Sequence, residues 1–319
     1  MNAARQVLAL AGGVGGGKLA RGLAAVLLPD NLTLVVNTAD DFVHLGLHIS
    51  PDIDSVLYAL ADLNDSVQGW GLAGDTDHVM DALARLGGDT WFKLRDRDLA
   101  THLLRTQKIS EGYSLSQVTQ LIADRLGVGH RVAPMTDAPV SSVVDTERGY
   151  LAFQDYFVRQ RCAPIFYGVR FEGAALAEPS AAFVAALECA DAIVICPSNP
   201  FLSIDPILAL VGVRAHLESS RAPVIAVSPI VGGNAVKGPL AKMMGERKIP
   251  PTSLSIARHY SSMVQGWLID AADRDEAAAI ESLGCAVRVT RTLMTTPEDK
   301  SQLAEAALDF AADLARQNS

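Results

Sequence analysis

A glycine-rich segment near the start of the chain, LALAGGVGGGKLARGL at residues 8–23, has the residue types of a phosphate-binding turn. Glycine lets a backbone approach a ligand closely, and the unpaired N–H groups at the start of a helix attract an anion. Five glycines lie within residues 12–17, and the lysine directly after them could add a positive charge. We therefore expect this turn to bind a phosphate group through Gly12, Gly13, Gly15, Gly16, Gly17 and Lys18.

The spacing of this segment matches two known patterns, neither of them completely. Gly12, Gly17 and Lys18 have the spacing of a P-loop, but Leu19 stands where a nucleotide-hydrolysing P-loop carries the serine or threonine that holds Mg²⁺. A loose dinucleotide-binding fingerprint that ends at Ala20 fits equally well. The structural alternative is a tight strand-to-helix turn without a ligand. Because the hydroxyl is missing, any metal ion must be held elsewhere.

Four aspartates within fifteen residues follow this segment and offer oxygen ligands for a metal. Asp40 and Asp41 end a strand-like run, and Asp52 and Asp54 lie in SPDIDSVLYAL. Mg²⁺ typically takes one or two carboxylates together with substrate phosphates. Pro51 also fits the first position of a helix, where an acidic side chain stabilises the N-terminus. Helix capping is therefore as good an interpretation of any one aspartate as metal binding.

A second polar cluster lies in WFKLRDRDLATHLLRT at residues 91–106. Lys93 and Arg97 belong to a run of alternating charges, and Asp98 and His102 are one helical turn apart. Such a run is typical of a solvated helix start, and it has no third histidine or cysteine at a spacing that would complete a zinc site. Four aromatic residues could stack on a planar ligand, although such residues more often lie in the core: Phe42, Trp70, Trp91 and Phe92.

Apolar runs that end in polar residues alternate with helical patterns, which predicts an α/β fold with a parallel sheet flanked by helices. The expected strands lie within residues 6–13, 32–41, 190–200 and 222–233, and the first helix is expected over residues 18–27. Ligands of open α/β sheets bind beyond the carboxyl ends of the strands. The four polar endings should therefore meet at one edge of the sheet.

The segment from about residue 55 to about residue 165 has a different pattern and predicts a mainly helical insertion. Helices are expected at residues 55–63, 77–88 and 114–127, followed by short strands at 140–146 and 149–153. A final amphipathic helix is expected over residues 298–317. No linker rich in proline, glycine and serine separates the insertion from the rest. We expect residues 1–319 to form a single domain in which the insertion builds one wall of the site.

The composition is that of a soluble globular protein, with 49% hydrophobic and 20% charged residues. A formal net charge of −9 argues against broad binding to nucleic acid or acidic membranes, which needs clustered lysine and arginine. The four cysteines have no zinc or redox spacing, and the N-terminus does not read as a signal peptide. No segment reaches the roughly 20 apolar residues of a membrane span. We expect a cytoplasmic protein.

Nine segments occur together in one order between about residue 8 and about residue 270: AGGVGGGKLARGL, VVNTADDF, ISPDIDSVLYAL, KLRDRDLATHLLRT, ISEGYSLSQVT, PMTDAPVSS, FQDYFVRQR, PSNPFLSIDPIL and VSPIVGGNAVKGP. In combination they resemble the 2-phospho-L-lactate transferase family of deazaflavin coenzyme biosynthesis. The resemblance implies a Rossmann-like fold and a Mg²⁺-dependent transferase. Family members move a phosphorylated small acid from its guanosine diphosphate-linked form to the ribityl hydroxyl of the deazaflavin Fo. A phosphodiester forms and GMP leaves.

The resemblance also implies roles for individual residues. The nucleotide would lie against the glycine segment with Lys18 and against further residues at strand ends, namely Asn37, Ser198, Asn199 and Gly232. The acceptor Fo would contact Asp54, Lys93, Arg97 and His102. Mg²⁺ would be held by Asp40 and Asp41, and Asp41 or Asp54 would orient or deprotonate the reacting hydroxyl.

Two other function classes stay open. An NAD-dependent oxidoreductase fits the loose fingerprint, but Asn37 stands where an acid that binds the ribose is expected. A related nucleotide-binding protein without deazaflavin transfer is the other, although SPDID and RDRDLATH argue against it. The transferred acid is open as well, because a pocket separates phospholactyl, phosphoenolpyruvyl and phosphoglyceryl groups by only ~1–3 kcal/mol unless it binds the extra hydroxyl. The resemblance further implies a homodimer.

Overall fold

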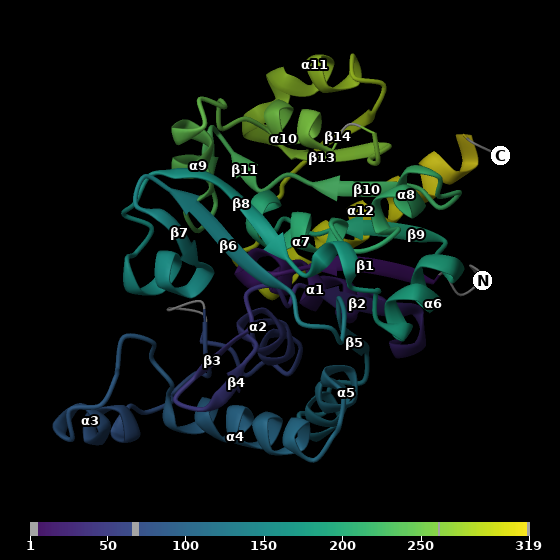
Figure 1. The fold of residues 1–319 in the computed structure, drawn as a ribbon. Coiled ribbons are helices and arrows are strands. Elements are labelled where there is room, and N and C mark those ends of the chain that lie inside the picture. Colours follow the sequence, from purple (N-terminus) through teal and green to yellow (C-terminus); the bar gives the residue numbers. More distant parts are fainter. Residues whose placement is uncertain (1–5, 66–69, 261, 318–319) are drawn as a thin grey trace.

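The centre of the protein is a sheet of seven parallel strands, seen in a computed structural model that describes residues 6–65, 70–260 and 262–317 (Figure 1). In the order of the sheet these are β14 (Ala286–Thr290), β13 (Gly266–Asp270), β10 (Val224–Val227), β9 (Ala192–Ile195), β1 (Val7–Ala11), β2 (Leu32–Val36) and β5 (Arg131–Pro134). Helices cover both faces of this sheet, so the predicted Rossmann-like α/β fold is confirmed.

The chain order of the strands reverses at β1. The strands β2 and β5 extend the sheet on one side of β1, and β9, β10, β13 and β14 extend it on the other. Leu10 of β1 lies opposite Val35 on one side and Ile195 on the other, in parallel register. Such a reversal is the topological switch point at which open α/β sheets bind ligands, beyond the carboxyl ends of the strands.

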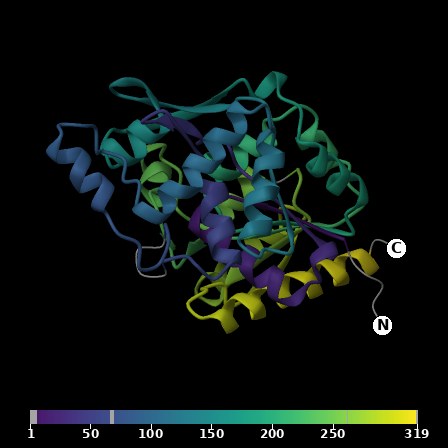
Figure 2. The ribbon, with the colours of Figure 1, turned by 90° about the horizontal axis from the view of Figure 1, so that it is seen from below.

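The strands of this sheet are buried on both faces, which is why they are continuous apolar runs without alternation. Val7, Ala9 and Ala11 of β1 face a layer of four helices, namely α1 (Gly13–Val26), α2 (Pro51–Leu60), α5 (Leu115–Arg125) and α12 (Pro297–Gln317). Figure 2 shows α1 and α12 side by side. Their close approach requires Gly22, because a Cβ there would lie 2.1 Å from the carbonyl oxygen of Lys300.

The opposite face of the sheet packs against helices from the second half of the chain. These are α6 (Ala181–Cys189), α7 (Asp205–Leu208), α8 (Val213–Glu218), α9 (Leu240–Glu246), α10 (Ser253–His259) and α11 (Ala277–Glu281). Leu8 and Leu10 of β1 point into this layer, and Trp267 of β13 is fully buried in it. The two layers together make a three-layer α/β/α arrangement.

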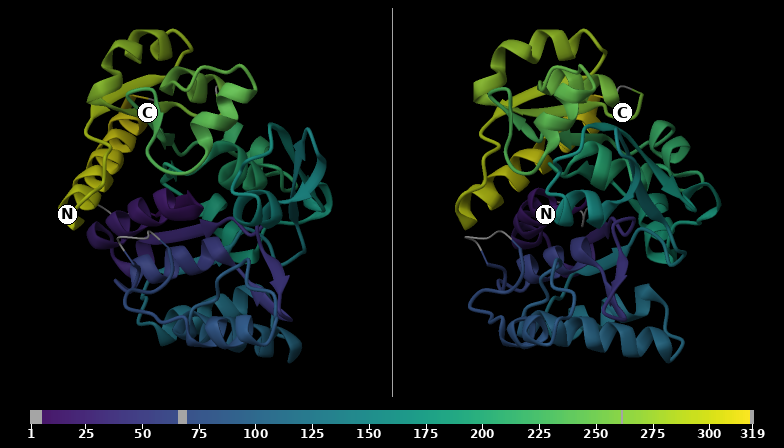
Figure 3. Two further views of the ribbon diagram at one scale, coloured as in Figure 1. Left: turned by 90° about the vertical axis from the view of Figure 1, so that its left-hand side faces the viewer. Right: turned by 60° about the vertical axis from the view of Figure 1, so that its left-hand side comes forward.

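Two insertions leave the sheet beside the switch point. The first, between β2 and β5, contains the hairpin of β3 (Phe42–His44) and β4 (Leu47–Ile49), then α2, α3 (His78–Arg85), α4 (Asp96–Ser110) and α5. The second, between β5 and β9, contains the antiparallel sheet of β6 (Ser141–Thr146), β7 (Gly149–Ala152) and β8 (Phe166–Glu172). Figure 3 places α3, α4 and α5 at the end of the molecule opposite to α10 and α11.

The predicted elements of residues 55–165 are present, but the segment is divided. Helices α2, α3 and α5 and strands β6 and β7 lie where the sequence predicts them. Strand β5 lies inside the same range and pairs with β2 in the main sheet. Its four residues, RVAP, are too few to stand out as a strand in the sequence.

The C-terminal helix α12 spans Pro297–Gln317, as predicted. Among the described residues, no helix is both long and apolar enough to span a bilayer.

Candidate functional site

The predicted glycine turn is the beginning of α1. The helix starts at Gly13, which has a left-handed φ of +60°, and so begins five residues before the predicted start at Lys18. A Cβ at Gly15 would lie 2.3 Å from the carbonyl oxygen of Pro197, and one at Gly16 would lie 2.5 Å from the hydroxyl of Ser198. These glycines therefore allow the helix start to pack against the turn that follows β9.

Hydrogen bonds tie the ends of β1 and β9 together. The N–H of Gly12 donates to Ser198 Oγ at 3.1 Å, and Ser198 Oγ donates to the carbonyl oxygen of Gly12 at 2.8 Å. The side-chain oxygen of Asn199 accepts the N–H groups of Phe201 and Leu202 at 3.0 and 3.3 Å. Both side chains hold the turn together here, so their contact with a nucleotide stays a prediction.

The end of β2 meets the same edge. The backbone N–H of Asn37 donates to the carbonyl oxygen of Ala11 at 3.1 Å. The side-chain amide of Asn37 donates to Asp52 Oδ2 at 3.1 Å and to the carbonyl oxygen of Leu202 at 3.3 Å. The predicted convergence of the strand ends of β1, β2 and β9 is therefore confirmed, and Asn37 links them.

The two other predicted nucleotide-binding residues are Lys18, in α1, and Gly232, in a turn after β10. Lys18 Nζ donates to the carbonyl oxygen of Met294 at 3.1 Å. Burial, together with the charge of Lys18, lowers the pKa of Lys237, so these two lysines are electrostatic neighbours. Gly232 is in the turn between β11 (Ile230–Val231) and β12 (Asn234–Ala235), and its N–H donates to Asp273 Oδ1 at 2.9 Å. Two positive charges, those of Lys18 and Lys237, are therefore close to each other.

Three carboxylates, which we call the acidic cluster, lie beside the start of α1: Asp40 and Asp52, which are buried, and Asp41, which is partly buried. Asp40 is 5% exposed and Asp52 is 8% exposed. Ser50 Oγ donates to Asp41 Oδ2 at 2.6 Å. The Oδ1 atoms of Asp40 and Asp41 are buried without a hydrogen-bond partner among the described residues. Unpartnered buried carboxylate oxygens are costly, and they are the ligands that Mg²⁺ prefers.

The pKa values of the acidic cluster are all raised. Burial, and next the charge of Asp52, raise the pKa of Asp40 well above its usual value. Burial raises the pKa of Asp41 well above its usual value, although Ser50 and Arg105 oppose the shift. Burial raises the pKa of Asp52 to about 6 against the hydrogen bonds from Asn37 and Gly13. In this cluster burial therefore outweighs the groups that favour the ionised carboxylates, Arg105 among them.

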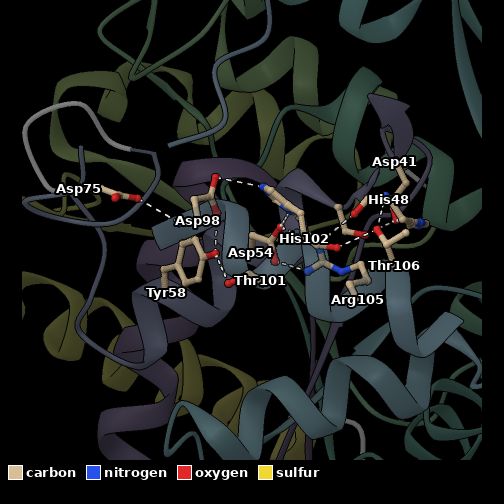
Figure 4. Close-up of polar contacts among 11 residues, drawn as sticks. Asp41, His48, Asp54, Tyr58, Asp75, Asp98, Thr101, His102, Arg105 and Thr106 are labelled. Carbon is tan, nitrogen blue, oxygen red and sulfur yellow. Dashed lines mark hydrogen bonds and ion pairs between the residues drawn. The ribbon is translucent and has the colours of Figure 1, made fainter. Parts of the chain in front are cut away.

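A second group, which we call the ion-paired cluster, joins α2 to α4: Asp54, Asp98, His102 and Arg105 (Figure 4). Arg105 Nη1 donates to Asp54 Oδ2 at 3.1 Å, and its Nη2 bonds Asp54 Oδ1, so the pair is bidentate. His102 Nε2 lies 3.1 Å from Asp98 Oδ2, and its Nδ1 lies 3.6 Å from Asp54 Oδ2. Tyr58 donates its hydroxyl to Asp98 Oδ1 at 2.6 Å.

The spacing of the ion-paired cluster alone would allow a metal. Asp54, Asp98 and His102 carry ligand atoms that all lie within 4.8 Å of one another. Arg105, however, already supplies a positive charge to this cluster. Burial opposes ionisation of Asp98, but His102, Tyr58 and Arg105 outweigh it and lower the pKa of Asp98. The chain itself therefore compensates these carboxylates.

The four predicted acceptor residues are split by the structure. Asp54 and His102 come together in the ion-paired cluster. Lys93 and Arg97 are exposed in the segment that leads into and begins α4, and Arg97 donates to the carbonyl oxygen of Ala73 at 3.0 Å. Their contact with an acceptor stays a prediction.

Sequence reasoning missed Arg105 and His48. Arg105 follows Asp98 and His102 at helical spacing, so the three share one face of α4, and this periodicity could have revealed it. His48 Nε2 lies 3.5 Å from Asp41 Oδ2. Burial, then the charges of Arg105 and His102, lower the pKa of His48 to about 4. Short hairpin strands carry little sequence signal, so nothing in the sequence marked His48.

The predicted aromatic residues mostly pack together. Phe42 and Phe92 have ring centroids 4.8 Å apart, and Trp91 lies 5.7 Å from Phe92. Phe42 and Phe92 also pack against a small apolar cluster around Ile49 and Leu94. These two rings therefore have a packing role, while Trp70 is 40% exposed.

Residues 7–300 match the family model described as 2-phospho-L-lactate transferase CofD. The chain is 38% identical over 315 residues to the phosphoenolpyruvate transferase of Streptomyces coelicolor, covering 97% of this chain and 99% of that protein. It is 40% identical over 313 residues to the phosphoenolpyruvate transferase of Kitasatospora aureofaciens, covering 96% and 98%. It is 39% identical over 299 residues to the 2-phospho-L-lactate transferase of Methanosarcina acetivorans, covering 94% and 97%.

A solved structure has the same fold. The crystal structure of a member of the upf0052 family from Bacillus halodurans matches with a TM-score of 0.65 and 18% sequence identity. The match covers 95% of this chain and 99% of the other. At this identity the likeness concerns the architecture alone.

Proposed function

The chain belongs to the 2-phospho-L-lactate transferase family, and on this premise we propose which group it transfers and to what. The donor is a phosphorylated three-carbon acid linked to guanosine diphosphate, and the acceptor is the ribityl hydroxyl of the deazaflavin Fo. The products are a phosphodiester and GMP. Relatives of similar identity carry different names, phosphoenolpyruvate transferase and 2-phospho-L-lactate transferase. The acid is therefore the part of the proposal that needs a direct measurement.

The observation that carries the proposal is the contact between the start of α1 and the acidic cluster. A Cβ on Gly12 would lie 2.5 Å from Asp52 Oδ2, so backbone and carboxylate touch at the switch point. The N–H groups and dipole of a helix start favour a phosphate, and Lys18 of the same helix has Lys237 as an electrostatic neighbour. Phosphates and a cation would thus lie side by side, which is what transfer of a phosphoryl-linked group requires.

The acidic cluster fits Mg²⁺. Asp40 and Asp41 each have one buried oxygen without a partner among the described residues, and hard oxygen ligands suit this ion. Asp52 adds a third carboxylate, and burial raises the pKa values of Asp40 and Asp52, so a bound cation would favour the ionised form of both. When bound there, Mg²⁺ would neutralise charge on the diphosphate.

The residues of the chain would divide the remaining work. The start of α1 binds the diphosphate and fixes the acid-linked phosphorus. Asp54 or Asp41 accepts the proton of the Fo hydroxyl as its oxygen attacks that phosphorus. The bond between this phosphorus and the bridging oxygen of the diphosphate breaks, and GMP leaves with the bond's electron pair. Only one of these two carboxylates is needed to accept the proton, so the other can orient the Fo hydroxyl.

A mass-spectrometric assay tests the proposal. The purified protein is incubated with Fo, Mg²⁺ and each of three guanosine diphosphate-linked acids: phospholactyl, phosphoenolpyruvyl and phosphoglyceryl. We expect a phosphodiester of Fo and an equal amount of GMP with at least one of them. Asp41→Asn and Asp54→Asn should each slow the transfer, and near-normal turnover in both variants would remove the assigned roles.

Other outcomes of the assay identify the rival functions. Binding of GDP without binding of Fo or transfer would indicate a nucleotide-binding protein without deazaflavin chemistry. Thermal stabilisation by NAD with none by GDP would indicate an oxidoreductase. A homodimer is part of the proposal, and sedimentation velocity measures it.

A further inference from the structure

Arg105 is an unusual residue of the first insertion, because its side chain is 0% exposed. Arginine is almost never fully buried unless it is paired. It lies in α4, and its partner Asp54 lies in α2, so the pair fixes two helices of the insertion to each other. The neighbours of this charge are themselves polar, with Asp54 and His102 closest to the guanidinium.

The contacts of Arg105 fix one carboxylate in both position and rotation. Two parallel N–H groups of the guanidinium bond the two oxygens of Asp54. Arg105 Nη1 also lies 3.2 Å from His102 Nδ1 and 3.5 Å from the carbonyl oxygen of His48. A guanidinium only donates, so His102 Nδ1 is the acceptor, and the ring proton belongs on Nε2, which faces Asp98.

We propose that Arg105 is a positioning residue, which holds the Asp54 carboxylate in the orientation that the Fo hydroxyl needs. The inference rests on the proposed function, because that function gives Asp54 its role toward the acceptor. Arg105 does not touch the reacting atoms in this account. It acts through Asp54.

Stability alone gives a weak reason for such a pair. A buried ion pair is commonly no more stabilising than apolar side chains of similar volume. A planar guanidinium does, however, define the plane of a carboxylate, which an ammonium group does not. Figure 4 shows Arg105 and His102 converging on Asp54 from the same helix. The pair is therefore better suited to orienting the Asp54 carboxylate than to stabilising the fold.

The kinetic test is a cycle of Arg105→Lys and Asp54→Asn. Arg105→Lys keeps the positive charge but cannot make the bidentate contact with Asp54. We expect kcat/KM for Fo to fall at least about tenfold, because a reacting group misplaced by about 1 Å can lower the rate by two orders of magnitude. In the Asp54→Asn background the same change should alter kcat/KM by less than about twofold, since Arg105 acts through Asp54. The KM of Arg105→Lys for the guanosine diphosphate-linked donor should equal that of the wild type.

The control is Arg21→Lys. Arg21 makes a second bidentate pair, with Asp62 at the surface, with N–O distances of 2.8 Å. We expect this variant to keep wild-type kinetics. Arg105→Lys activity within twofold of wild type, or an equal loss in the Asp54→Asn background, would overturn the proposal.

Two further measurements test the proposal if Arg105→Lys does not fold or if the protein does not act on Fo. Asp54→Glu keeps the charge and moves the carboxylate by one methylene, so positioning predicts a loss of similar size, and full activity contradicts it. If the wild-type protein transfers nothing to Fo, the proposed function fails. A crystal structure of Arg105→Lys then tests positioning alone: a carboxylate of Asp54 shifted by more than about 0.5 Å supports it, and an unmoved one contradicts it.

Discussion

Two clusters of buried carboxylates lie within one insertion and differ in how their charge is compensated. The acidic cluster of Asp40, Asp41 and Asp52 has raised pKa values, and Asp40 and Asp41 each have an oxygen without a hydrogen-bond partner in the described part of the chain. The ion-paired cluster around Asp54 and Asp98 has Arg105 and His102 among its members. Arg105 forms an ion pair within the second cluster, whereas we propose that the first cluster binds a metal ion. The difference distinguishes the proposed metal site from the residues that we propose orient Asp54.

Asp52 and Asp54 show how one helix supplies both clusters. They are two residues apart in the first turn of α2, so they point to nearly opposite sides of the helix. Asp52 faces Gly12 and Asn37 at the strand ends, whereas Asp54 faces Arg105 on α4. The two aspartates lie in the same helical turn, so their different surroundings come from residues that are distant in the sequence.

The largest expected effect is on the ion-paired cluster. Arg105→Met leaves the Asp54 charge buried without its partner, which should lower the free energy of unfolding by about 3–5 kcal/mol. Urea unfolding followed by circular dichroism measures it. Arg21→Met, which breaks the surface pair with Asp62, should cost only about 0–1 kcal/mol. If the two variants lose the same free energy of unfolding, the buried pair of Arg105 and Asp54 contributes no more to stability than the surface pair.

The pH dependence of stability should have opposite signs for the two clusters. Asp52 has a folded pKa of about 6 against a usual 3.8, so between these values the native state binds more protons than the unfolded state. Its contribution is present below the unfolded pKa and is lost as the pH rises through the window, by up to about 3 kcal/mol. Asp98 has a lowered folded pKa, so its contribution is present above the unfolded pKa and is lost as the pH falls.

Unfolding free energies at several pH values, in EDTA, measure these slopes. Asp52→Asn should remove much of the wild-type decline between about pH 4 and pH 6. Asp98→Asn should leave that decline in place and reduce the loss of stability at more acidic pH. Parallel pH curves for wild type and Asp52→Asn would contradict the assignment of buried, uncompensated charge to the acidic cluster.

A smaller effect is expected where the start of α1 touches the acidic cluster. A Cβ in Gly12→Ala would lie 2.5 Å from Asp52 Oδ2 and 2.7 Å from the Cβ of Ser203. Overpacking of this kind should lower the free energy of unfolding by about 1–3 kcal/mol. Gly245→Ala in α9 has no atom within 4 Å of the new Cβ, so it should stabilise by up to about 1 kcal/mol. Thermal unfolding measures the stability of both variants. A Gly12→Ala variant as stable as the wild type would mean that Gly12 and Asp52 are not in close contact.

Much of the fold was predictable because its signals are local. Apolar runs that end in polar residues placed β1, β2, β9 and β10, and the pattern of small and acidic residues placed α12. The start of α1 was misplaced because a run of glycines reads as a loop. Only the approach of Pro197 and Ser198, far along the chain, explains why glycine is needed in a helix there.

The site was predictable in part, for a related reason. The sequence marked Asp40, Asp41, Asp52 and Asp54 as one group, but it could not divide them between two clusters. That division depends on Arg105, which is 51 residues from Asp54 in the chain. Ser198 and Asn199 were assigned to a nucleotide, and the structure gives both of them hydrogen bonds within the turn after β9.

The most direct test of the central claim is to locate the divalent cation. Binding of Mn²⁺, as a paramagnetic substitute for Mg²⁺, is titrated by electron paramagnetic resonance in the presence of GDP for wild type, Asp41→Asn and Asp98→Asn. We expect wild type and Asp98→Asn to bind one ion with similar affinity. Asp41→Asn should bind it at least about tenfold more weakly, since a carboxylate ligand is lost. Loss of binding in Asp98→Asn with unchanged binding in Asp41→Asn would place the metal in the ion-paired cluster and contradict the account.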